Sequence, residues 1–138
     1  MVQNFRIWSH AAASPGGHAQ FDAGLRAGVP VVADAFHPTE GESTFSAWVD
    51  FVVARGGEWP TRYGVRVGGA QLPGLTESAF CEGLSRVILV ASESSPVVEG
   101  AVRALRGHGI EVYWEYALGV GAPVDPALLD GIVVRGYE

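Results

Sequence analysis

The segment Arg86-Val-Ile-Leu-Val-Ala91 constrains the fold of this chain more than any other. After its first residue it is wholly apolar. A short apolar run of this kind is typical of a strand that is buried on both faces, as a central strand of a parallel sheet is. The segment therefore predicts a sheet with other layers packed against it.

Strand-like and helix-like segments alternate along the rest of the chain. The apolar residues between Phe45 and Val53 recur at helical spacing, and Gly28 and Gly56 follow segments with helical patterns. The alternation predicts one α/β domain over residues 1–138, a three-layer sandwich in which helices flank a mostly parallel or mixed sheet of about five to six strands. Strands are expected at 5–8, 31–36, 63–67, 86–91, 110–116 and 132–134. Helices are expected after Gly17, after Thr44, and at 77–84, 97–106 and 127–130.

Composition excludes several kinds of chemistry. All nine basic residues are Arg, so no lysine is present to form a Schiff base. Cys81 is the single cysteine, which rules out an internal disulfide and a zinc site with two or more thiolates from one chain. We accordingly expect no metal and no cofactor.

Charge and hydropathy limit the partners. The net charge of −6 and the lack of a basic cluster argue against a nucleic-acid partner. No segment is apolar over the roughly 18 residues that a membrane span needs, and no signal peptide is visible at the N-terminus. These features predict a soluble cytoplasmic protein with no membrane partner.

Polar side chains lie at the carboxyl ends of four of the expected strands. Ligands of open α/β sheets bind beyond the carboxyl ends of the strands, where the connecting loops meet. A small-molecule site drawn from these positions would use the following residues: His10 after the first strand, Asp34 and His37 at the end of the second, and Ser92, Glu93 and Ser94 after the central one. Glu115 lies at the end of the fifth strand.

Two of these segments have alternative interpretations. Ser92-Glu-Ser-Ser-Pro96 could hold an anion, or it could be an ordinary helix cap. His37 could be a general base oriented by Asp34, or a surface histidine before a turn proline. No nucleophile stands at a recognised spacing, so whether the protein is an enzyme stays open.

Two stretches resemble a known family. They are Gly17-His-Ala-Gln-Phe-Asp-Ala-Gly-Leu-Arg-Ala-Gly28 and the segment from Gly83 through Ser95-Pro-Val-Val-Glu-Gly100 to Val112. The first is similar to the His-Ala-Glu helix of the riboflavin-biosynthesis deaminase domain, in the cytidine-deaminase-like superfamily. The second is similar to that domain's strand, helix and Gly-Ile-Glu-Val strand.

The family's zinc chemistry is not matched. That family binds zinc with a histidine and a Pro-Cys-x-x-Cys motif, and a glutamate moves the proton. Here Gln20 replaces the glutamate, and His37-Pro-Thr-Glu40 stands where the cysteines belong. The resemblance therefore implies a scaffold without zinc catalysis, in which His18 is a hydrogen-bonding residue of a ligand pocket.

Three functions are compatible with the sequence. The first is binding of a small molecule, such as a nucleobase-like or nucleoside-like ligand, at the carboxyl edge of the sheet. The alternative is an acidic interaction module, for instance an immunity or antitoxin-type protein that covers a basic face of its partner. In the third, the chain forms a homo-oligomer whose loops complete a neighbour's site.

Overall fold

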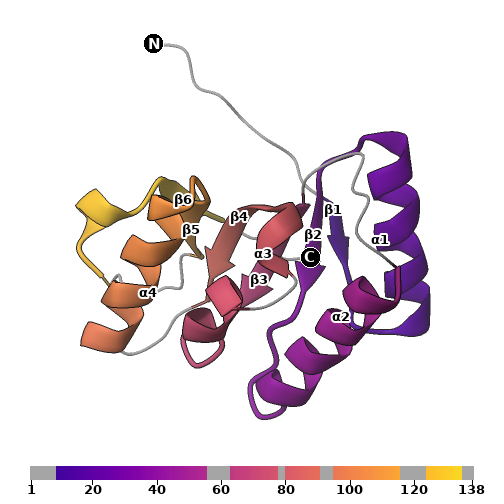
Figure 1. Cartoon of the computed structure of the whole chain (residues 1–138), viewed down its shortest axis with the longest axis horizontal. Helices are drawn as coiled ribbons and strands as arrows, with labels where there is room; N and C mark the ends of the chain where they lie inside the picture. Colours follow the sequence, from indigo (N-terminus) through magenta and orange to yellow (C-terminus); the bar gives the residue numbers. More distant parts are fainter. Residues whose placement is uncertain (1–8, 56–62, 78–79, 91–94, 116–123, 135–138) are drawn as a thin grey trace.

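The computed structural model describes residues 9–55, 63–77, 80–90, 95–115 and 124–134. They form a six-stranded sheet in which every neighbouring pair of strands is parallel, in the order β1-β2-β3-β4-β5-β6 (Figure 1). The predicted α/β fold with a parallel sheet is confirmed. The strands are β1 (Ser9–Ala11), β2 (Val31–Asp34), β3 (Tyr63–Val67), β4 (Leu84–Leu89), β5 (Glu111–Glu115) and β6 (Gly131–Val133).

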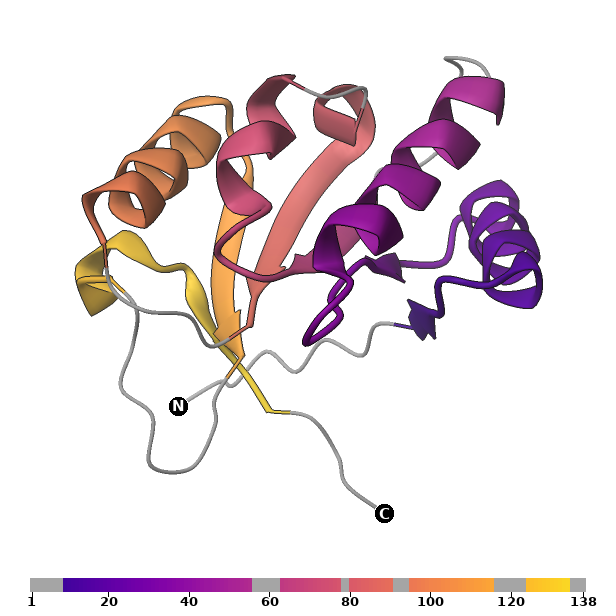
Figure 2. The ribbon, with the colours of Figure 1, turned by 90° about the horizontal axis from the view of Figure 1, so that it is seen from below.

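Helical segments connect consecutive strands. Because crossovers between parallel strands are right-handed, a sheet whose strands follow chain order places its connections on one face. Figure 2 shows α1, α2 and α4 along the same side of the sheet. The described helices thus make one outer layer. They are α1 (Pro15–Ala27), α2 (Gly41–Arg55), the 3₁₀ helix η1 (Leu72–Glu77), α3 (Phe80–Gly83), α4 (Pro96–Gly107) and the 3₁₀ helix η2 (Pro126–Leu128).

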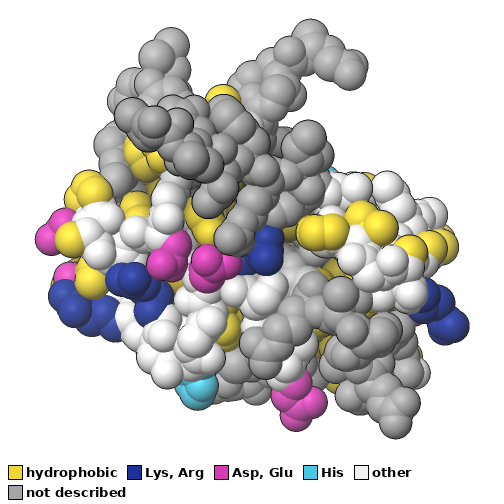
Figure 3. Space-filling view, turned by 90° about the horizontal axis from the view of Figure 1, so that it is seen from above, with side chains coloured by type: hydrophobic (Ala, Val, Ile, Leu, Met, Phe, Trp, Pro, Cys, Tyr) yellow, Lys and Arg dark blue, Asp and Glu magenta, His cyan; other side chains and the backbone are white. Residues whose placement is uncertain are grey.

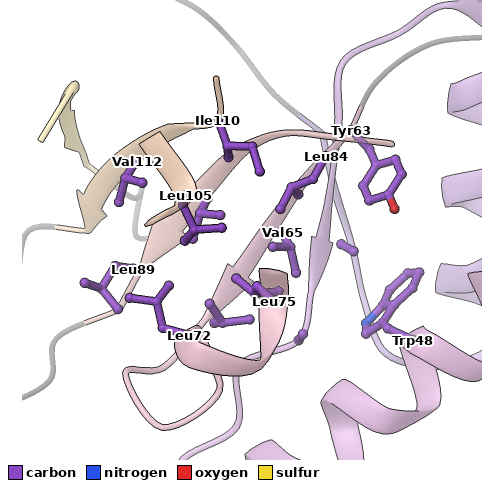
Figure 4. Close-up of a cluster of buried hydrophobic side chains, with 14 of the residues drawn as sticks. Trp48, Tyr63, Val65, Leu72, Leu75, Leu84, Leu89, Leu105, Ile110 and Val112 are labelled. Carbon is purple, nitrogen blue, oxygen red and sulfur yellow. The ribbon is translucent and has the colours of Figure 1, made fainter. Parts of the chain in front are cut away.

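One apolar core lies between this helical layer and the sheet. Phe21 and Trp48 from the helices are fully buried against strand residues such as Val65 and Val87. Figure 4 shows Leu72 and Leu75 of η1 on this side of the sheet, together with Val65, Leu84 and Leu89 of β3 and β4. Burial of these side chains is the main driving force for packing the layer.

Local sequence signals set the ends of α1. Ser14 caps the helix, because its hydroxyl accepts a hydrogen bond from the N–H of Gly17 at 3.0 Å. Pro15 occupies the first turn, where its missing N–H costs nothing. Gly28 ends the helix with φ of 73°, a conformation that favours glycine. The expected stop at Gly28 is confirmed.

Several expected boundaries differ from the structure. The strand expected at 5–8 lies outside the described residues, and the first described strand is Ser9–Ala11. The helix expected at 77–84 is confirmed over Phe80–Gly83, which form α3, whereas Glu77 ends the 3₁₀ helix η1 and residues 78–79 lie outside the described residues. Leu84 begins β4, where burial of its side chain outweighs the helical pattern. The helix after the acidic loop begins at Gly41, earlier than Thr44.

The described helices include none that is long and apolar enough to cross a membrane.

Candidate functional site

The face of the sheet opposite the helices, called the polar face below, carries charged side chains beside buried apolar ones such as Val32 and Ile88. Parallel sheets are usually covered by apolar side chains on both faces. Because side chains alternate along a strand, the residues between the core positions point to this opposite face. Asp34 of β2 pairs in register with Arg66 of β3, Arg66 with Ile88 of β4, and Ile88 with Tyr113 of β5. These residues form a row across the sheet, and Glu115 lies two residues beyond Tyr113.

Three charged side chains join along this row, and we call them the Asp34–Arg66–Glu115 cluster. Arg66 donates from Nε to Oε1 of Glu115 at 2.8 Å and from Nη2 to Oε2 at 2.9 Å. Its Nη1 donates to Oδ1 of Asp34 at 3.0 Å. The pairing with Glu115 is bidentate, the geometry in which a guanidinium binds a carboxylate most specifically. Asp34 and Glu115 both end their strands, so the cluster lies toward the carboxyl edge of the sheet.

The cluster is buried to different depths. The side chains of Arg66 and Glu115 are 7% and 9% exposed, whereas that of Asp34 is 24% exposed. Burial alone would lower the pKa of Arg66, but the hydrogen bonds and charges of Glu115 and Asp34 outweigh it and raise that pKa. Arg66 therefore stays cationic. Two carboxylates contact this one cation, and Asp34 is the most accessible member of the cluster.

Asp34 is fixed from several directions. Its Oδ1 accepts from Arg66 and, at 3.4 Å, from the N–H of Phe36. Its main-chain oxygen accepts from the indole N–H of Trp48 at 3.0 Å. Its second carboxylate oxygen, Oδ2, has no hydrogen-bond partner among the described residues. A partly exposed, firmly held carboxylate with one open oxygen can accept hydrogen bonds from a ligand.

An aromatic ring also contacts the guanidinium of Arg66. The central carbon of Arg66 lies 4.9 Å from the centre of the Phe36 ring, within the range of a cation–π interaction. Phe36 follows Asp34 by two residues, so the strand end supplies both a charged and an aromatic contact.

His37 does not join the cluster through any described contact. Its Nδ1 accepts from the N–H of Glu40 at 2.8 Å and from that of Thr39 at 3.1 Å. The side chain is 42% exposed. The ring thus accepts hydrogen bonds from main-chain N–H groups of the loop before α2, as an Asp or Asn side chain does in an Asx turn. A contact from His37 to a ligand stays a prediction.

His18 lies in the helical layer, away from the polar face. Its ring is centred 4.4 Å from the Trp48 ring and 4.7 Å from the Phe51 ring. Its Nε2 is buried and has no hydrogen-bond partner among the described residues. Burial lowers the pKa of His18. The sequence expectation of His18 as a hydrogen-bonding pocket residue finds no described contact to support it.

His10 lies inside β1 instead of following the first strand, which corrects its expected place in a loop. It pairs in register with Val32, so it belongs to the polar face, one row nearer the amino ends than Asp34. Ser92, Glu93 and Ser94 lie outside the described residues. Their neighbour Ser95 caps α4 by accepting from the N–H of Val98 at 3.1 Å.

Sequence reasoning missed Arg66 as a site residue. A signal for it exists, because the alternation in Tyr63-Gly-Val-Arg-Val67 places Gly64 and Arg66 on one face of β3. The lack of a side chain at Gly64 makes room for the side chain of Arg86. A Cβ at Gly64 would lie only 2.8 Å from Cγ of Arg86. A charged residue at an inner position of a strand indicates a face that is not plain core.

Elsewhere on the surface of the described residues, positively and negatively charged side chains lie close together. Figure 3 shows Arg side chains next to Asp and Glu instead of one continuous acidic area. Glu99 and Arg103 form one exposed pair of opposite charge, 3.2 Å apart. Within the described ranges, no group of three or more His, Cys, Asp or Glu side chains could hold a metal ion. An acidic docking face for a basic partner stays a prediction.

No family model, curated protein or solved structure matches this chain. The deaminase-like resemblance therefore stays a prediction.

Proposed function

We propose that the protein binds a small molecule of the nucleobase or nucleoside class on the polar face of its sheet, at the carboxyl ends of β2, β3 and β5. The observation that carries this proposal is the Asp34–Arg66–Glu115 cluster. Asp34 contacts the ligand, Arg66 fixes Asp34, and Glu115 fixes Arg66.

Energetics support a role beyond stability. Replacing a buried ion pair by well-packed apolar residues is often neutral or stabilising, so a buried charge cluster is poor evidence for a purely structural role. In open α/β sheets, the carboxyl ends of strands are also the usual place for ligands. Charged side chains with restricted exposure at that place are candidates for a binding site.

The cluster offers both hydrogen-bond acceptors and donors. Oδ2 of Asp34 is an open acceptor, and Arg66 uses three of the five N–H donors that a guanidinium carries. Nucleobases present N–H donors beside ring nitrogen or carbonyl acceptors on one edge. A carboxylate and a phosphate both offer hydrogen-bond acceptors, so we expect the N–H groups of the base, and not a phosphate, to meet Asp34.

The sequence resemblance supports the same ligand class without zinc catalysis. The deaminase-like family acts on bases, and Gln20 stands in place of its proton-carrying glutamate. Gln20 is exposed on α1, in the helical layer. Binding is therefore the function we propose, with no reaction assigned.

Titration calorimetry with guanosine, adenosine and cytidine tests this proposal. We expect at least one nucleoside to bind the wild-type protein, and Asp34→Asn to weaken that binding by about tenfold, because a charged acceptor is lost. Asp50→Asn is the matched control, since Asp50 is an exposed carboxylate on α2. Absence of binding by the wild type, or equal binding by Asp34→Asn, would overturn the proposal.

A further inference from the structure

We propose that Trp48 is a positioning residue for Asp34, so that the helical layer controls the geometry of the binding site on the other face of the sheet. The effect on ligand binding rests on the proposed function, but the effect of Trp48 on the position of Asp34 can be tested without a ligand. The indole N–H of Trp48 donates to the main-chain oxygen of Asp34 at 3.0 Å, and this bond links α2 to the end of β2.

The edge of the sheet explains why this bond matters. β1 pairs with β2 only as far as Ala11 and Ala33. Asp34 is the next residue of β2, so its carbonyl lies beyond the last paired residue of β1. A carbonyl at a strand end needs another partner when it is removed from water. The Trp48 indole supplies that partner and thereby fixes the peptide group that carries Asp34.

The Trp48 ring is itself held firmly. It is 0% exposed, and its centre lies 4.4 Å from the His18 ring, 5.0 Å from the Phe21 ring and 6.0 Å from the Phe51 ring. These contacts come from both α1 and α2. Such packing leaves the indole little freedom to turn away, so the position of its N–H is set by the helical layer.

Asp34 is therefore held on both sides of the sheet. Its carbonyl is bound on the helical side, and its Oδ1 accepts from Arg66 and from the N–H of Phe36 on the polar side. Removing the indole bond would leave Asp34 held by its pairing with β3 and by its side-chain contacts, without a partner for its carbonyl. The open Oδ2 would then occupy a wider range of positions, which weakens binding of a rigid ligand.

The test removes the N–H and keeps the ring. Trp48 is replaced by 3-benzothienylalanine, which has the shape of tryptophan with sulfur in place of the N–H, and separately by phenylalanine. Leu105→Ala is the matched control, because it weakens the buried helical layer at α4, away from Trp48 (Figure 4). The readouts are the carboxyl-carbon resonance of Asp34 and the Nε–H resonance of Arg66, together with nucleoside affinity.

We expect both Trp48 variants to shift the Asp34 and Arg66 resonances and to weaken nucleoside binding by about two- to tenfold, the value of one hydrogen bond. Leu105→Ala should leave these resonances and the affinity unchanged even where it lowers the melting temperature. Equal shifts in Leu105→Ala and the Trp48 variants, or no shift in the benzothienyl variant, would overturn the inference.

The two proposals fail in different ways. If the wild type binds no nucleoside but the resonances respond as expected, Trp48 positions Asp34 and the proposed ligand class is wrong. If the wild type binds and Asp34→Asn weakens binding, yet the benzothienyl variant binds normally, the proposed function stands and the positioning role of Trp48 is wrong.

Discussion

Arg66 reaches across β4 to bind both carboxylate oxygens of Glu115, at 2.8 and 2.9 Å. The two residues lie 49 positions apart in the chain. Their strands, β3 and β5, do not pair with each other, because β4 lies between them. The side-chain bond thus ties together strands that the backbone hydrogen bonds connect only through a third.

Arg66→Met should lower the free energy of unfolding by about 3 to 5 kcal/mol, because it leaves the buried carboxylate of Glu115 and the partly exposed one of Asp34 without their cation. Chemical denaturation at neutral pH measures this change. Arg103→Met is the control: its guanidinium binds Glu99 on an exposed helix surface, and its loss should cost less than about 1 kcal/mol. A double variant with Glu115→Met as well should recover part of the lost stability. Equal small effects at Arg66 and Arg103 would show that the cluster is not buried as described.

His18 should make stability depend on pH. Burial lowers the pKa of His18 in the folded state below its ordinary value of 6.5, so the unfolded chain takes up the proton first as the pH falls. The stability from neutral His18 is fully present above pH 6.5 and is lost as the pH falls from 6.5 through the folded-state pKa. Unfolding measured between pH 7.5 and about 5 in steps should show this decline.

In His18→Phe the decline below pH 6.5 should be smaller, because the aromatic contact with Trp48 and Phe51 is kept and the titration is removed. His108→Gln serves as the control, since His108 is exposed at the end of α4. If His18→Phe declines as steeply as the wild type, the acid sensitivity has another source.

The two glycines at the start of α1 should respond differently to alanine. A Cβ on Gly17 would collide with the carbonyl oxygen of Ala12, whereas one on Gly16 would meet nothing within 4 Å. Gly17→Ala should lower the free energy of unfolding by about 2 kcal/mol or more. Gly16→Ala should leave it unchanged or raise it by up to about 1 kcal/mol. Thermal unfolding of both variants compares them directly, and similar melting temperatures would contradict the described loop geometry.

His37→Ala should destabilise the start of α2, because the Nδ1 that accepts from Thr39 and Glu40 is lost. The expected cost is about 1 kcal/mol, typical of a lost capping interaction. His37→Asn should recover much of this, since its side-chain oxygen can accept similar bonds. Denaturant titrations of the two variants provide the measurement. Identical stabilities of His37→Ala and His37→Asn would show that Nδ1 has no capping role.

Sequence patterns predicted the strands better than the connections. The strand at Tyr63–Val67 has the expected bounds, and the apolar run at 86–91 falls largely on β4, with strands on both sides. Hydrophobic periodicity is strongest where a strand is buried, which explains both results. The bounds of the helix expected at 77–84 are confirmed only over Phe80–Gly83, because short 3₁₀ and α turns have no long hydrophobic period from which bounds can be predicted.

The candidate site could be predicted only in part. Asp34 stands at the end of a buried strand, so its place near the carboxyl edge could be predicted from the sequence. Its contact with Arg66 and the bond from Arg66 to Glu115 depend on strand order and register, which alternation along one strand does not determine. The bond from Trp48 depends in addition on how α2 packs on the sheet.

The strand order has a consequence for how the protein is made. Each described strand pairs with the strand that precedes it along the chain. During translation, every new strand therefore leaves the ribosome when its partner is already exposed, and the sheet can grow in the order of synthesis. The Arg66–Glu115 bond must wait until β5 has been added two strands after β3. Until β5 is added, the guanidinium of Arg66 lacks its bidentate partner. The pairing of charges on the polar face is complete only after Glu115 has been synthesised.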